Sequence, residues 1–413
     1  MSELSHYPGG ERLVRLLDAK INPGERVFLR CDFNVPIKDG IIQDSSRIDA
    51  AIPTIELLLR KQARIVCASH LGRPTEGADP KLSLEPIAEY LSQKLNNNVY
   101  FAHDAFGDAV VHQSKSLLVG EILLLENLRF HYKDECENNK AFSYQLSQLA
   151  DSYVNDAFGV CHRAHASVAS ITDFFKNKAC GLLLEKEIKA LSEIAYAPQR
   201  PLITILGGAK VSDKINVIEA LMKKSHKIII GGAMAHTFCL AEGHRLGKSL
   251  IEESKVPLAR KILQNAHKHS CKIVLPVDFT AAPSLESTEE SISYYEASNF
   301  PQDQSSFDIG PKSQELFARE LVGAQSVFWN GPLGVFEKNL FSKGTMALTR
   351  TISQLDSPVK ICGGGDSVAA VKKMQAQDYF QHISTGGGAS LELIEGKKLP
   401  GIESLKMTTR NKT

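Results

Sequence analysis

The 413-residue sequence has no long apolar run, and none of its apolar stretches approaches the roughly 18 residues of a transmembrane helix. It also has little net charge: 48 basic and 47 acidic side chains leave a formal charge of +1. The chain therefore has no large overall positive charge that would attract nucleic acid or an anionic membrane surface. The first ten residues lack a charged leader followed by an apolar segment, so we expect no secretory signal. We predict no nucleic-acid and no membrane partner.

Paired cysteines are missing as well. The eight cysteines are scattered without a CxxC pair, which argues against a zinc ribbon and a redox motif. We expect free thiols and a cytoplasmic location.

The common nucleotide and catalytic motifs are absent. The nearest approach to GxxxxGK[ST] is "GHRLGKS" at 243–249, which is one residue short. GxGxxG followed by an acidic residue, HEXXH, GxSxG and the protein-kinase HRD and DFG set do not occur either. A standard phosphate loop, a dinucleotide fold, a zinc peptidase, an α/β-hydrolase and a protein kinase are therefore disfavoured.

What the sequence does contain is one repeated element: a short apolar run, then a turn, then a helical pattern. Such runs begin near residues 26, 64, 98, 121 and 152 in the first half and near 201, 227, 272, 326, 358 and 382 in the second. Buried strands that alternate with helices indicate parallel sheets covered on both faces. Eleven strands are too many for one ordinary sheet. We predict an α/β chain with two doubly wound (Rossmann-like) domains whose parallel sheets face each other across a cleft.

The domain boundary is expected at "APQRP", residues 197–201, after a long helical stretch. The predicted domains are 1–196 and 197–395, followed by a C-terminal tail, 396–413, that packs back on the first domain. The polar segment 284–308 has no clear apolar period, so we expect it to be a surface excursion.

Basic side chains follow the strands of the first half, and ligands of such sheets bind beyond the carboxyl ends of the strands. Five arginines repel each other near one cleft unless an anion neutralises them, and arginine suits phosphate and carboxylate. The expected ligand is small and strongly acidic, although any one arginine alone would more often be a surface ion-pair partner. The cationic residues are Arg30, Arg47, His70, Arg73, Arg129, His162, Arg163 and His165.

Glycines follow the strands of the second half instead, in "LGGAKVSDKI", "IGGAMAHTF", "WNGPLGVFE", "CGGGDSVAA" and "STGGGASLE". Five such turns describe exposed backbone that can approach a polyphosphate closely. Lys210 and Lys214 flank one helix start, and Asp366 lies in the opening turn of another, where it is also expected to cap the helix. We predict a mononucleotide polyphosphate with a divalent ion, and phosphoryl transfer between the two domains.

These strings, together with "RCDFNVP", "SHLGRP", "ENLRF", "NDAFGVCHRAHAS" and "DIGPKS", resemble the phosphoglycerate kinase family over about residues 25–402. The resemblance implies reversible phosphoryl transfer between ATP and the carboxylate of 3-phosphoglycerate, giving ADP and 1,3-bisphosphoglycerate, in glycolysis. It further implies Mg²⁺ as the cofactor, hinge bending and a monomer.

The same resemblance assigns roles to residues of this chain. For 3-phosphoglycerate it implies Asp32, Asn34, Arg47, His70, Arg73, Arg129 and Arg163. The nucleotide is expected at Gly208, Ala209, Lys210, Lys214, Asn330, Pro332, Gly334, Val335, Glu337, Gly363, Gly364, Gly365, Asp366 and Ser367. Arg47, Lys210 and Lys214 would be catalytic, and Asp366 would serve Mg²⁺.

Ala233 stands where the family usually has a third glycine, and His236 is also unexpected, so the base preference stays open. Two alternatives remain: a catalytically silent relative that binds a nucleotide or an anion, and another kinase that forms acyl phosphates. The presence of Arg47, Lys214 and Asp366 argues against the first, and "DFNVP" with "SHLGRP" against the second.

Overall fold

The computed structural model describes residues 13–74, 77–356 and 359–406. Its internal contacts divide the chain into two compact units: residues up to Lys189 together with those from Lys398, and Ala190–Lys397. The division falls within helix α6 (Leu182–Tyr196), whereas the sequence prediction places the boundary after it. None of the helices in the described ranges has the length and apolar character needed to cross a membrane.

The first unit is built on a six-stranded parallel sheet in the order β5-β6-β4-β1-β7-β8. The strands are β1 (Arg26–Arg30), β4 (Arg64–Ala68), β5 (Val99–Ala102), β6 (Ile122–Leu125), β7 (Ser152–Asn155) and β8 (Lys178–Cys180). The sequence analysis predicts the first five and misses the short edge strand β8. The chain builds outward from β1 through β4 and then returns to the other side of β1 with β7, which makes β1 and β7 the switch point where ligands of such sheets bind.

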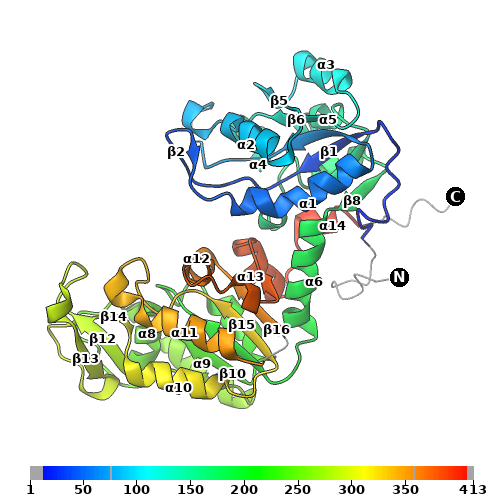
Figure 1. The fold of residues 1–413 in the computed structure, drawn as a ribbon. Coiled ribbons are helices and arrows are strands. Elements are labelled where there is room, and N and C mark those ends of the chain that lie inside the picture. Colours follow the sequence, from blue (N-terminus) through cyan, green and yellow to red (C-terminus); the bar gives the residue numbers. More distant parts are fainter. Residues whose placement is uncertain (1–12, 75–76, 357–358, 407–413) are drawn as a thin grey trace. The chain divides into compact units, whose positions relative to one another are not determined.

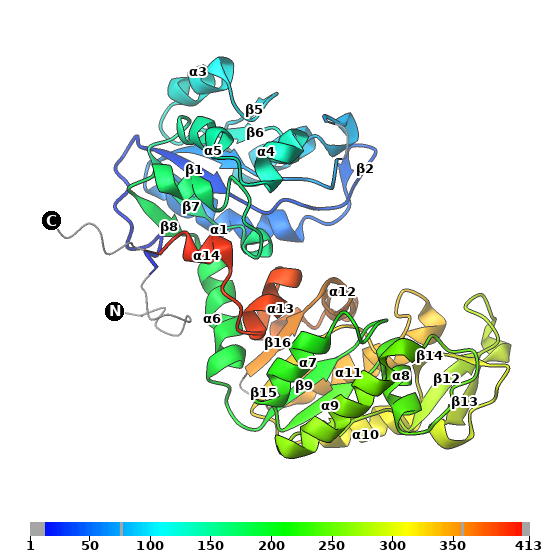
Figure 2. The same ribbon diagram turned by 180° about the vertical axis from the view of Figure 1, so that it is seen from behind.

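Helices cover both faces of this sheet. Helices α1 (Ser46–Arg60) and α2 (Glu85–Leu95) lie over the face seen in Figure 1, and α4 (Tyr132–Cys136) and α5 (Lys140–Ser147) lie over the other, seen in Figure 2. Helix α1 buries an apolar stripe at helical spacing, which packs into the main core of the unit. Helix α3 (Asp108–Ser116) and the hairpin β2 (Ile37–Lys38) and β3 (Ile41–Ile42) complete the outer elements.

The second unit repeats this design with the sheet order β11-β10-β9-β15-β16-β17, and all its neighbours are parallel. The strands are β9 (Leu202–Leu206), β10 (Lys227–Ile230), β11 (Lys272–Val274), β15 (Ser326–Asn330), β16 (Val359–Gly363) and β17 (His382–Ile383). The chain reverses its direction of growth between β9 and β15, which are neighbours. The α/β prediction with two parallel sheets is confirmed.

The helices of the second unit also form two layers. Helices α10 (Pro311–Leu321) and α11 (Lys343–Gln354) lie over one face in Figure 1, while α7 (Ile215–Met222), α8 (Ala233–Ala241) and α9 (Val256–Lys268) lie over the other in Figure 2. Helices α12 (Gly365–Lys373) and α13 (Gly388–Ile394) follow the last two strands. The buried strands and helices enclose one main core, which includes the single tryptophan, Trp329.

The polar segment 284–308 forms no third domain, as the sequence predicts, and most of its positions are exposed or half-buried, but it is more regular than a surface excursion. It contains β13 (Ser293–Glu296) and most of β14 (Ser305–Ile309), which pair antiparallel with β12 (Asp278–Ala282) in a separate three-stranded sheet. A half-exposed antiparallel strand needs only alternate apolar residues, so its apolar signal is weaker than that of a buried parallel strand. The exposed and intermediate positions of β13 fit this description.

The segment from Lys398 to Lys406 belongs to the first unit. Helix α14 (Pro400–Glu403) brings the Gly401 amide to 2.9 Å from the Cys161 carbonyl, and the Ser404 hydroxyl donates to the Val168 carbonyl. Lys178 in turn donates to the Ser404 carbonyl at 2.6 Å. Residues 407–413 of the predicted tail lie outside the described residues.

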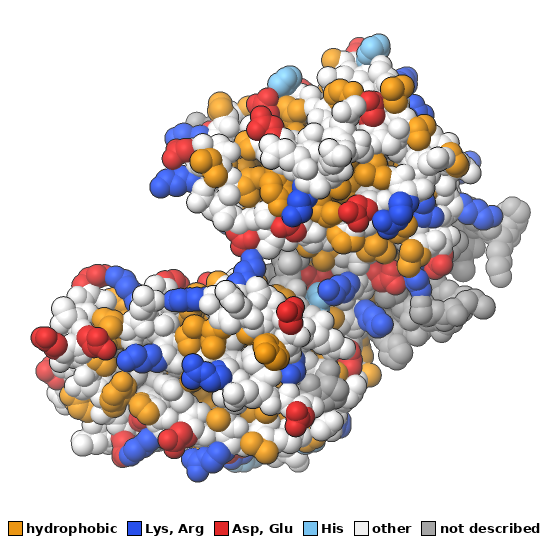
Figure 3. All heavy atoms as spheres, in the orientation of Figure 1, with side chains coloured by type: hydrophobic (Ala, Val, Ile, Leu, Met, Phe, Trp, Pro, Cys, Tyr) orange, Lys and Arg blue, Asp and Glu red, His pale blue; other side chains and the backbone are white. Residues whose placement is uncertain are grey.

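The charged side chains on the surface and the state of the cysteines are both in keeping with the sequence, which has little net charge and no CxxC pair. On the face drawn in Figure 3, basic and acidic side chains are interspersed over each unit. All eight cysteines are free, and seven of them are buried.

Candidate functional site

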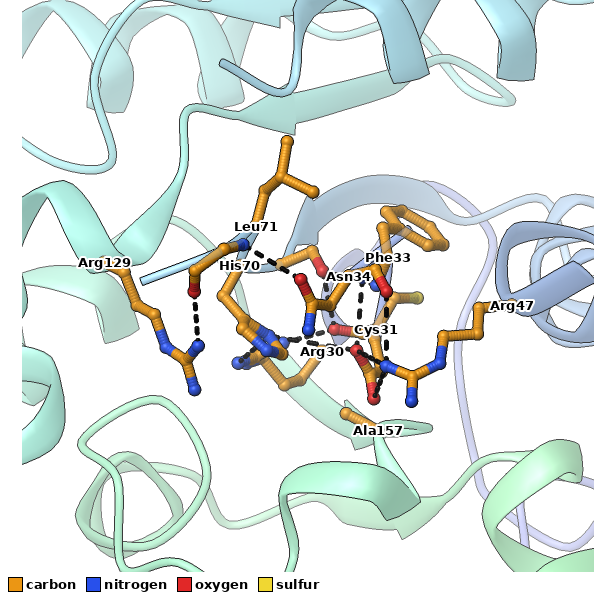
Figure 4. A network of polar contacts seen from close by, with 12 residues as sticks. Arg30, Cys31, Phe33, Asn34, Arg47, His70, Leu71, Arg129 and Ala157 are labelled. Carbon is orange, nitrogen blue, oxygen red and sulfur yellow. Dashed lines mark hydrogen bonds and ion pairs between the residues drawn. The ribbon is translucent and has the colours of Figure 1, made fainter. Parts of the chain in front are cut away.

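The carboxyl end of β1 places three of the predicted substrate residues together (Figure 4). Asp32 follows the strand, and its two carboxylate oxygens each accept a hydrogen bond of 3.2 Å from Nη1 of Arg47, which lies in the first turn of α1. The same Nη1 donates to the carbonyl of Asn34 at 3.3 Å. The side-chain oxygen of Asn34 accepts from the amide of Gly72, at the end of β4. Asp32 and Asn34 thus hold the guanidinium of Arg47, and Asn34 also holds the loop that follows β4.

His70 and Arg129 complete this arrangement (Figure 4). Arg129 follows β6 and donates to the Gly72 carbonyl at 2.6 Å, while its Nε is buried without a hydrogen-bond partner among the described residues. The ring of His70 is buried, and its Nδ1 lies 3.9 Å from Asp32. A buried guanidinium N–H without a partner is costly, so an acceptor that reached Arg129 would be bound favourably.

Arg30 does not point into this site as a free cation, and here the sequence expectation of five ligand-facing arginines is wrong. Its side chain is completely buried, and its Nε donates to the Ser167 hydroxyl at 2.8 Å. Glu135, also completely buried, lies 3.8 Å from Arg30 and accepts from both the amide and the hydroxyl of Ser167. Sequence reasoning missed Glu135 and Ser167, because only the tertiary structure brings them to Arg30.

The remaining predicted cations of this unit lie at the edge of the site. Arg163 and Arg73 are both exposed, and Nε of Arg163 donates to the ring of the adjacent His162 at 3.1 Å. Exposed arginines on two loops can reorient toward a ligand at little cost. The structure therefore brings Asp32, Asn34, Arg47, His70 and Arg129 together and leaves Arg73 and Arg163 on neighbouring loops.

The electrostatics of the first unit favour an anion. Burial, together with the charges of Arg30 and Arg129, holds the pKa of His70 well below its usual value, and the same causes lower the pKa of His165 to about 3. Burial and the neighbouring Arg30 also lower the pKa of Arg129. Burial is the largest cause of each shift, and the contribution from neighbouring cations is the part that a bound phosphate or carboxylate would relieve.

In the second unit, the predicted nucleotide residues gather where β9 and β15 meet. The turns after these two strands pack backbone against backbone: a side chain at Gly207 would collide with the Pro332 carbonyl, and one at Gly331, whose φ is +100°, with the backbone of Gly207. Glycine is required at such close approaches. The result is a floor of main chain at the switch point of the sheet.

Lys214 precedes α7 and contacts the side-chain oxygen of Asn330. Burial lowers the pKa of Lys214 to about 8, although Asp213 and Asp366 act in the opposite direction. Lys210, in the turn after β9, is exposed. The two lysines therefore differ: Lys214 is held in place, and Lys210 is free to move.

Asp366 lies in the first turn of α12, beside the Gly363–Gly365 turn. The expectation that it caps the helix is wrong, because the N-cap is Gly364, with φ +89°, and no side chain makes the capping hydrogen bond. The Asp366 carboxylate is exposed instead, and its pKa is raised, first by partial burial and then by the charge of Glu337. Ser367 is buried, and its hydroxyl accepts from the Gly331 amide at 2.6 Å, so it supports the turn after β15.

One cavity of about 260 Å³ lies at this switch point. Among the residues predicted for the nucleotide, those that line it are Gly208, Ala209, Pro332, Gly334, Val335, Glu337 and Asp366. The other residues predicted for the nucleotide are not among those that line it: Lys210, Lys214, Asn330, Gly363, Gly364, Gly365 and Ser367. Among its lining residues, Glu337 acts electrostatically on Asp366, and we call these two the charged end; Leu250 and Phe279 both contact His236, and we call this group the apolar end.

The apolar end includes residues that sequence reasoning missed or left open. His236 of α8 lines the cavity together with Ser306, Phe307 and Asp308 of β14. The three β14 residues belong to the segment expected to be a surface excursion. The only string in this region that resembles the family is "DIGPKS", and of the three residues it includes only Asp308.

The carboxylates at the charged end suit a divalent cation that is also held by a ligand. The described residues contain no group of three or more His, Cys, Asp or Glu side chains that could hold a metal by themselves. Mg²⁺, however, is commonly bound through one or two carboxylates plus substrate phosphates. Asp366 fits that role: its pKa is raised first by partial burial and then by the charge of Glu337, and a cation beside it would offset that repulsion.

Comparisons with known proteins agree with this picture. A family model described as phosphoglycerate kinase matches residues 17–397. The chain is 47% identical over 388 residues to the phosphoglycerate kinase of Koribacter versatilis, covering 92% of this chain and 96% of that one, and 46% identical over 387 residues to that of Clostridium novyi, with the same coverage.

Solved structures match over nearly the whole chain. The phosphoglycerate kinase of Coxiella burnetii has a TM-score of 0.86 at 37% identity, and that of Pyrococcus horikoshii has a TM-score of 0.84 at 32% identity. Each comparison covers 95% of this chain and 98% of the other.

Proposed function

The chain belongs to the phosphoglycerate kinase family, and from that premise we propose which of its residues bind the two substrates and carry the transfer. The enzyme is a phosphotransferase of glycolysis that acts between ATP and 3-phosphoglycerate. The observation that carries the proposal is the cavity of the second unit: its carboxylates at Glu337 and Asp366 suit a metal ion that a polyphosphate also binds, Lys214 lies near Asp366, and the apolar end suits a base.

We assign 3-phosphoglycerate to the carboxyl end of the first sheet. Asp32 and Asn34 would orient its polar carbon end, and His70, Arg73, Arg129 and Arg163 would surround its phosphate. The lowered pKa values of His70 and Arg129 are caused first by burial and then by neighbouring cations, and the cationic contribution supports this assignment. Arg47, held by Asp32, would face the transferring phosphoryl group.

The nucleotide is assigned to the second unit. Its phosphates would lie along the turns at Gly208–Lys210 and Gly363–Gly365, near Lys214 and Asn330, and the base would lie toward the apolar end of the cavity. Pro332, Gly334, Val335 and Glu337 would form one wall, and Ser367 would hold the turn that carries it. Asp366 would hold Mg²⁺, which supplies charge neutralisation between the nucleotide phosphates when it is bound.

The chemistry requires few protein groups. In the direction that consumes ATP, the nucleophile is a carboxylate, which is ionised at neutral pH because its ordinary pKa is about 3 to 4. No general base is needed, so Asp32 acts as an orienting partner of Arg47. Arg47 and Lys214, with Lys210 assisting from its exposed position, would stabilise the charge on the phosphoryl group as it moves.

In-line transfer requires reacting atoms about 3 to 3.5 Å apart, so the proposal includes a hinge-bending closure that brings the two ligands together and excludes water. Compaction in small-angle scattering when both ligands are present would support it, and an unchanged radius of gyration would contradict it. We further propose that the enzyme works as a monomer in the cytoplasm. The eight free cysteines are in keeping with a reducing compartment.

Calorimetric titration of Asp366→Asn tests the metal and nucleotide assignment. We expect the affinity for Mg-ADP to fall by about tenfold or more, the size of one lost charge-assisted contact, while the affinity for 3-phosphoglycerate stays unchanged. Asp378→Asn, an exposed substitution in the same unit, is the control and should change neither affinity. Equal losses for both ligands, or no loss for Mg-ADP, would contradict the assignment.

A further inference from the structure

The apolar end of the nucleotide cavity contains a hydrogen-bonded pair, His236 and Ser306, beside the carboxylate of Asp308, whose two oxygens accept from the Ile309 and Gly344 amides. His236 in α8 and Ser306 in β14 both line the cavity, among the apolar side chains of Leu250, Phe279 and Phe307. Both residues are almost completely buried, and the His236 ring packs edge-on against Phe279 with centroids 5.4 Å apart. In such surroundings the hydrogen-bonding capacity of the pair has a large effect on which ligand group is accepted.

The contacts of His236 determine which of its nitrogens carries the proton. Nδ1 lies 3.0 Å from the Leu250 carbonyl, and Nε2 lies 3.0 Å from the Ser306 hydroxyl. A carbonyl only accepts, so Nδ1 must be the donor. Burial lowers the pKa of His236 to about 4, so the ring carries a single proton at neutral pH. Nε2 is therefore an acceptor, and the Ser306 hydroxyl donates its proton to it.

Ser306 can therefore offer a ligand only the lone pairs of its hydroxyl oxygen. Its hydroxyl proton is used by His236, and its backbone amide donates to the Ser249 hydroxyl at 2.8 Å. Both nitrogens of His236 are occupied as well. The pair thus offers a ligand an acceptor and no donor.

We propose that His236 and Ser306 determine base specificity, by accepting a hydrogen bond from a 6-amino purine and rejecting a 6-oxo purine. The inference rests on the proposed function, which puts the base at this end of the cavity. An amino group can donate to Ser306, whereas an oxo group would bring a second acceptor against its lone pairs. A buried acceptor left without a donor is costly, and a site built around one hydrogen bond discriminates strongly against the analogue that cannot make it.

The test compares kcat/KM for Mg-ATP and Mg-ITP at pH 8, in the wild type, Ser306→Ala and His236→Phe. This pH lies above the pKa of the neighbouring Asp308, which burial raises to about 7, so that carboxyl is mostly ionised. We expect the wild type to prefer ATP by about tenfold or more. Ser306→Ala should bring the ratio toward one. His236→Phe should raise kcat/KM for ITP relative to ATP, because the freed hydroxyl can then donate to an oxo group.

The control is Ser353→Ala, whose hydroxyl donates to the Thr349 carbonyl within α11, away from the cavity. It should keep the wild-type ratio. Equal use of ATP and ITP by the wild type, or an unchanged ratio in either cavity variant, would overturn the inference while leaving the nucleotide site itself intact. If Ser306→Ala fails to fold, the ratios measured for the wild type and His236→Phe still test the proposed base specificity. An absence of any ATP-dependent turnover in the wild type would instead contradict the proposed function and the inference with it.

Discussion

Arg47 is the residue on which the proposed chemistry of the first unit depends most directly. Its Nη1 is held by both oxygens of Asp32 and by the Asn34 carbonyl, so the guanidinium is positioned before any ligand arrives. Preorganised donors of this kind stabilise a transition state without reorganisation at the moment of reaction. The role of Arg47 should therefore appear in kcat more than in substrate affinity.

We expect Arg47→Ala to lower kcat by a factor on the order of 100 or more, the usual loss when one transition-state donor is removed. Steady-state kinetics with both substrates varied will measure the change. Arg60→Ala, at the far end of the same helix, is the control, since the Arg60 side chain is 65% exposed. A variant with normal kcat and a raised KM would make Arg47 a binding residue only.

Lys214 leads to a prediction about pH. Burial lowers its pKa to about 8, so the free enzyme loses this positive charge as the pH rises through about 8. If the charge stabilises the transferring group, kcat/KM, which reports ionisations of the free enzyme, should fall on the alkaline side of that value. In Lys214→Arg, whose side chain stays charged, the alkaline fall should disappear even if the overall rate is lower. A wild-type profile that stays flat up to pH 9.5 would contradict the assignment.

At the scale of elements, helix α4 is tied to the end of β1 and to the loop after β7 by one buried network. Glu135 of α4 accepts from Ser167, which in turn accepts from Arg30, and the Glu135 carbonyl accepts from the Ala166 amide at 2.8 Å. Removing one partner of a buried ion pair leaves an uncompensated charge and typically costs about 3–5 kcal/mol.

Glu135→Gln should therefore lower the free energy of unfolding of the first unit and raise KM for 3-phosphoglycerate, while KM for ATP changes little. Denaturant unfolding and steady-state kinetics measure the two effects. Glu137→Gln, on an exposed position just after the same helix, should leave both unchanged. An increase of both KM values by the same factor would argue against a local positioning role.

The antiparallel sheet β12–β14 shows how an element of weak sequence signal can complete a site. Its last strand supplies Ser306, Phe307 and Asp308 to the cavity, and the Asp308 carboxylate accepts from the Gly344 amide at the start of α11. The sheet thereby connects the apolar end of the cavity to a helix of the main layer.

At the scale of the whole molecule, the chain returns to its first unit after completing the second. Gly401 packs tightly there: a side chain would meet a methyl group of Val168 at 2.5 Å and the Cα of Cys161 at 2.9 Å. Overpacking of this kind usually costs about 1–3 kcal/mol. The stability of the first unit thus depends on a segment about 200 residues further along the sequence than the rest of it.

Gly401→Ala should shift the unfolding of the first unit to lower denaturant concentration. The single tryptophan, Trp329, lies in the core of the second unit, so its fluorescence reports that unit, whereas circular dichroism reports both. We expect part of the circular dichroism transition to move while the fluorescence midpoint stays. Lys398→Ala, an exposed neighbour, is the control. Fluorescence and circular dichroism midpoints that moved together would mean that the two units unfold as one.

The sequence by itself determined the strand-and-helix alternation, the two parallel sheets and most residues that follow their strands. It could do so because buried parallel strands leave continuous apolar runs, and because their carboxyl ends carry the ligand residues. Asp32, Lys214 and Asp366 could be proposed as site residues on that basis, whereas the role proposed for Arg47, which lies in α1, came from the resemblance to the family.

Only the tertiary structure decided which charged residues face a site and which are paired with another residue in the core. In the sequence, Arg30 is indistinguishable from the other arginines near the strand ends of the first half. In the structure, Glu135, more than 100 positions away, pairs with it in the core. The apolar end of the cavity could be predicted only in part: the sequence singles out His236, but its partner Ser306 lies on an antiparallel strand 70 residues away. Their hydrogen-bond directions follow from burial and from the Leu250 carbonyl, and no local pattern in a sequence encodes either.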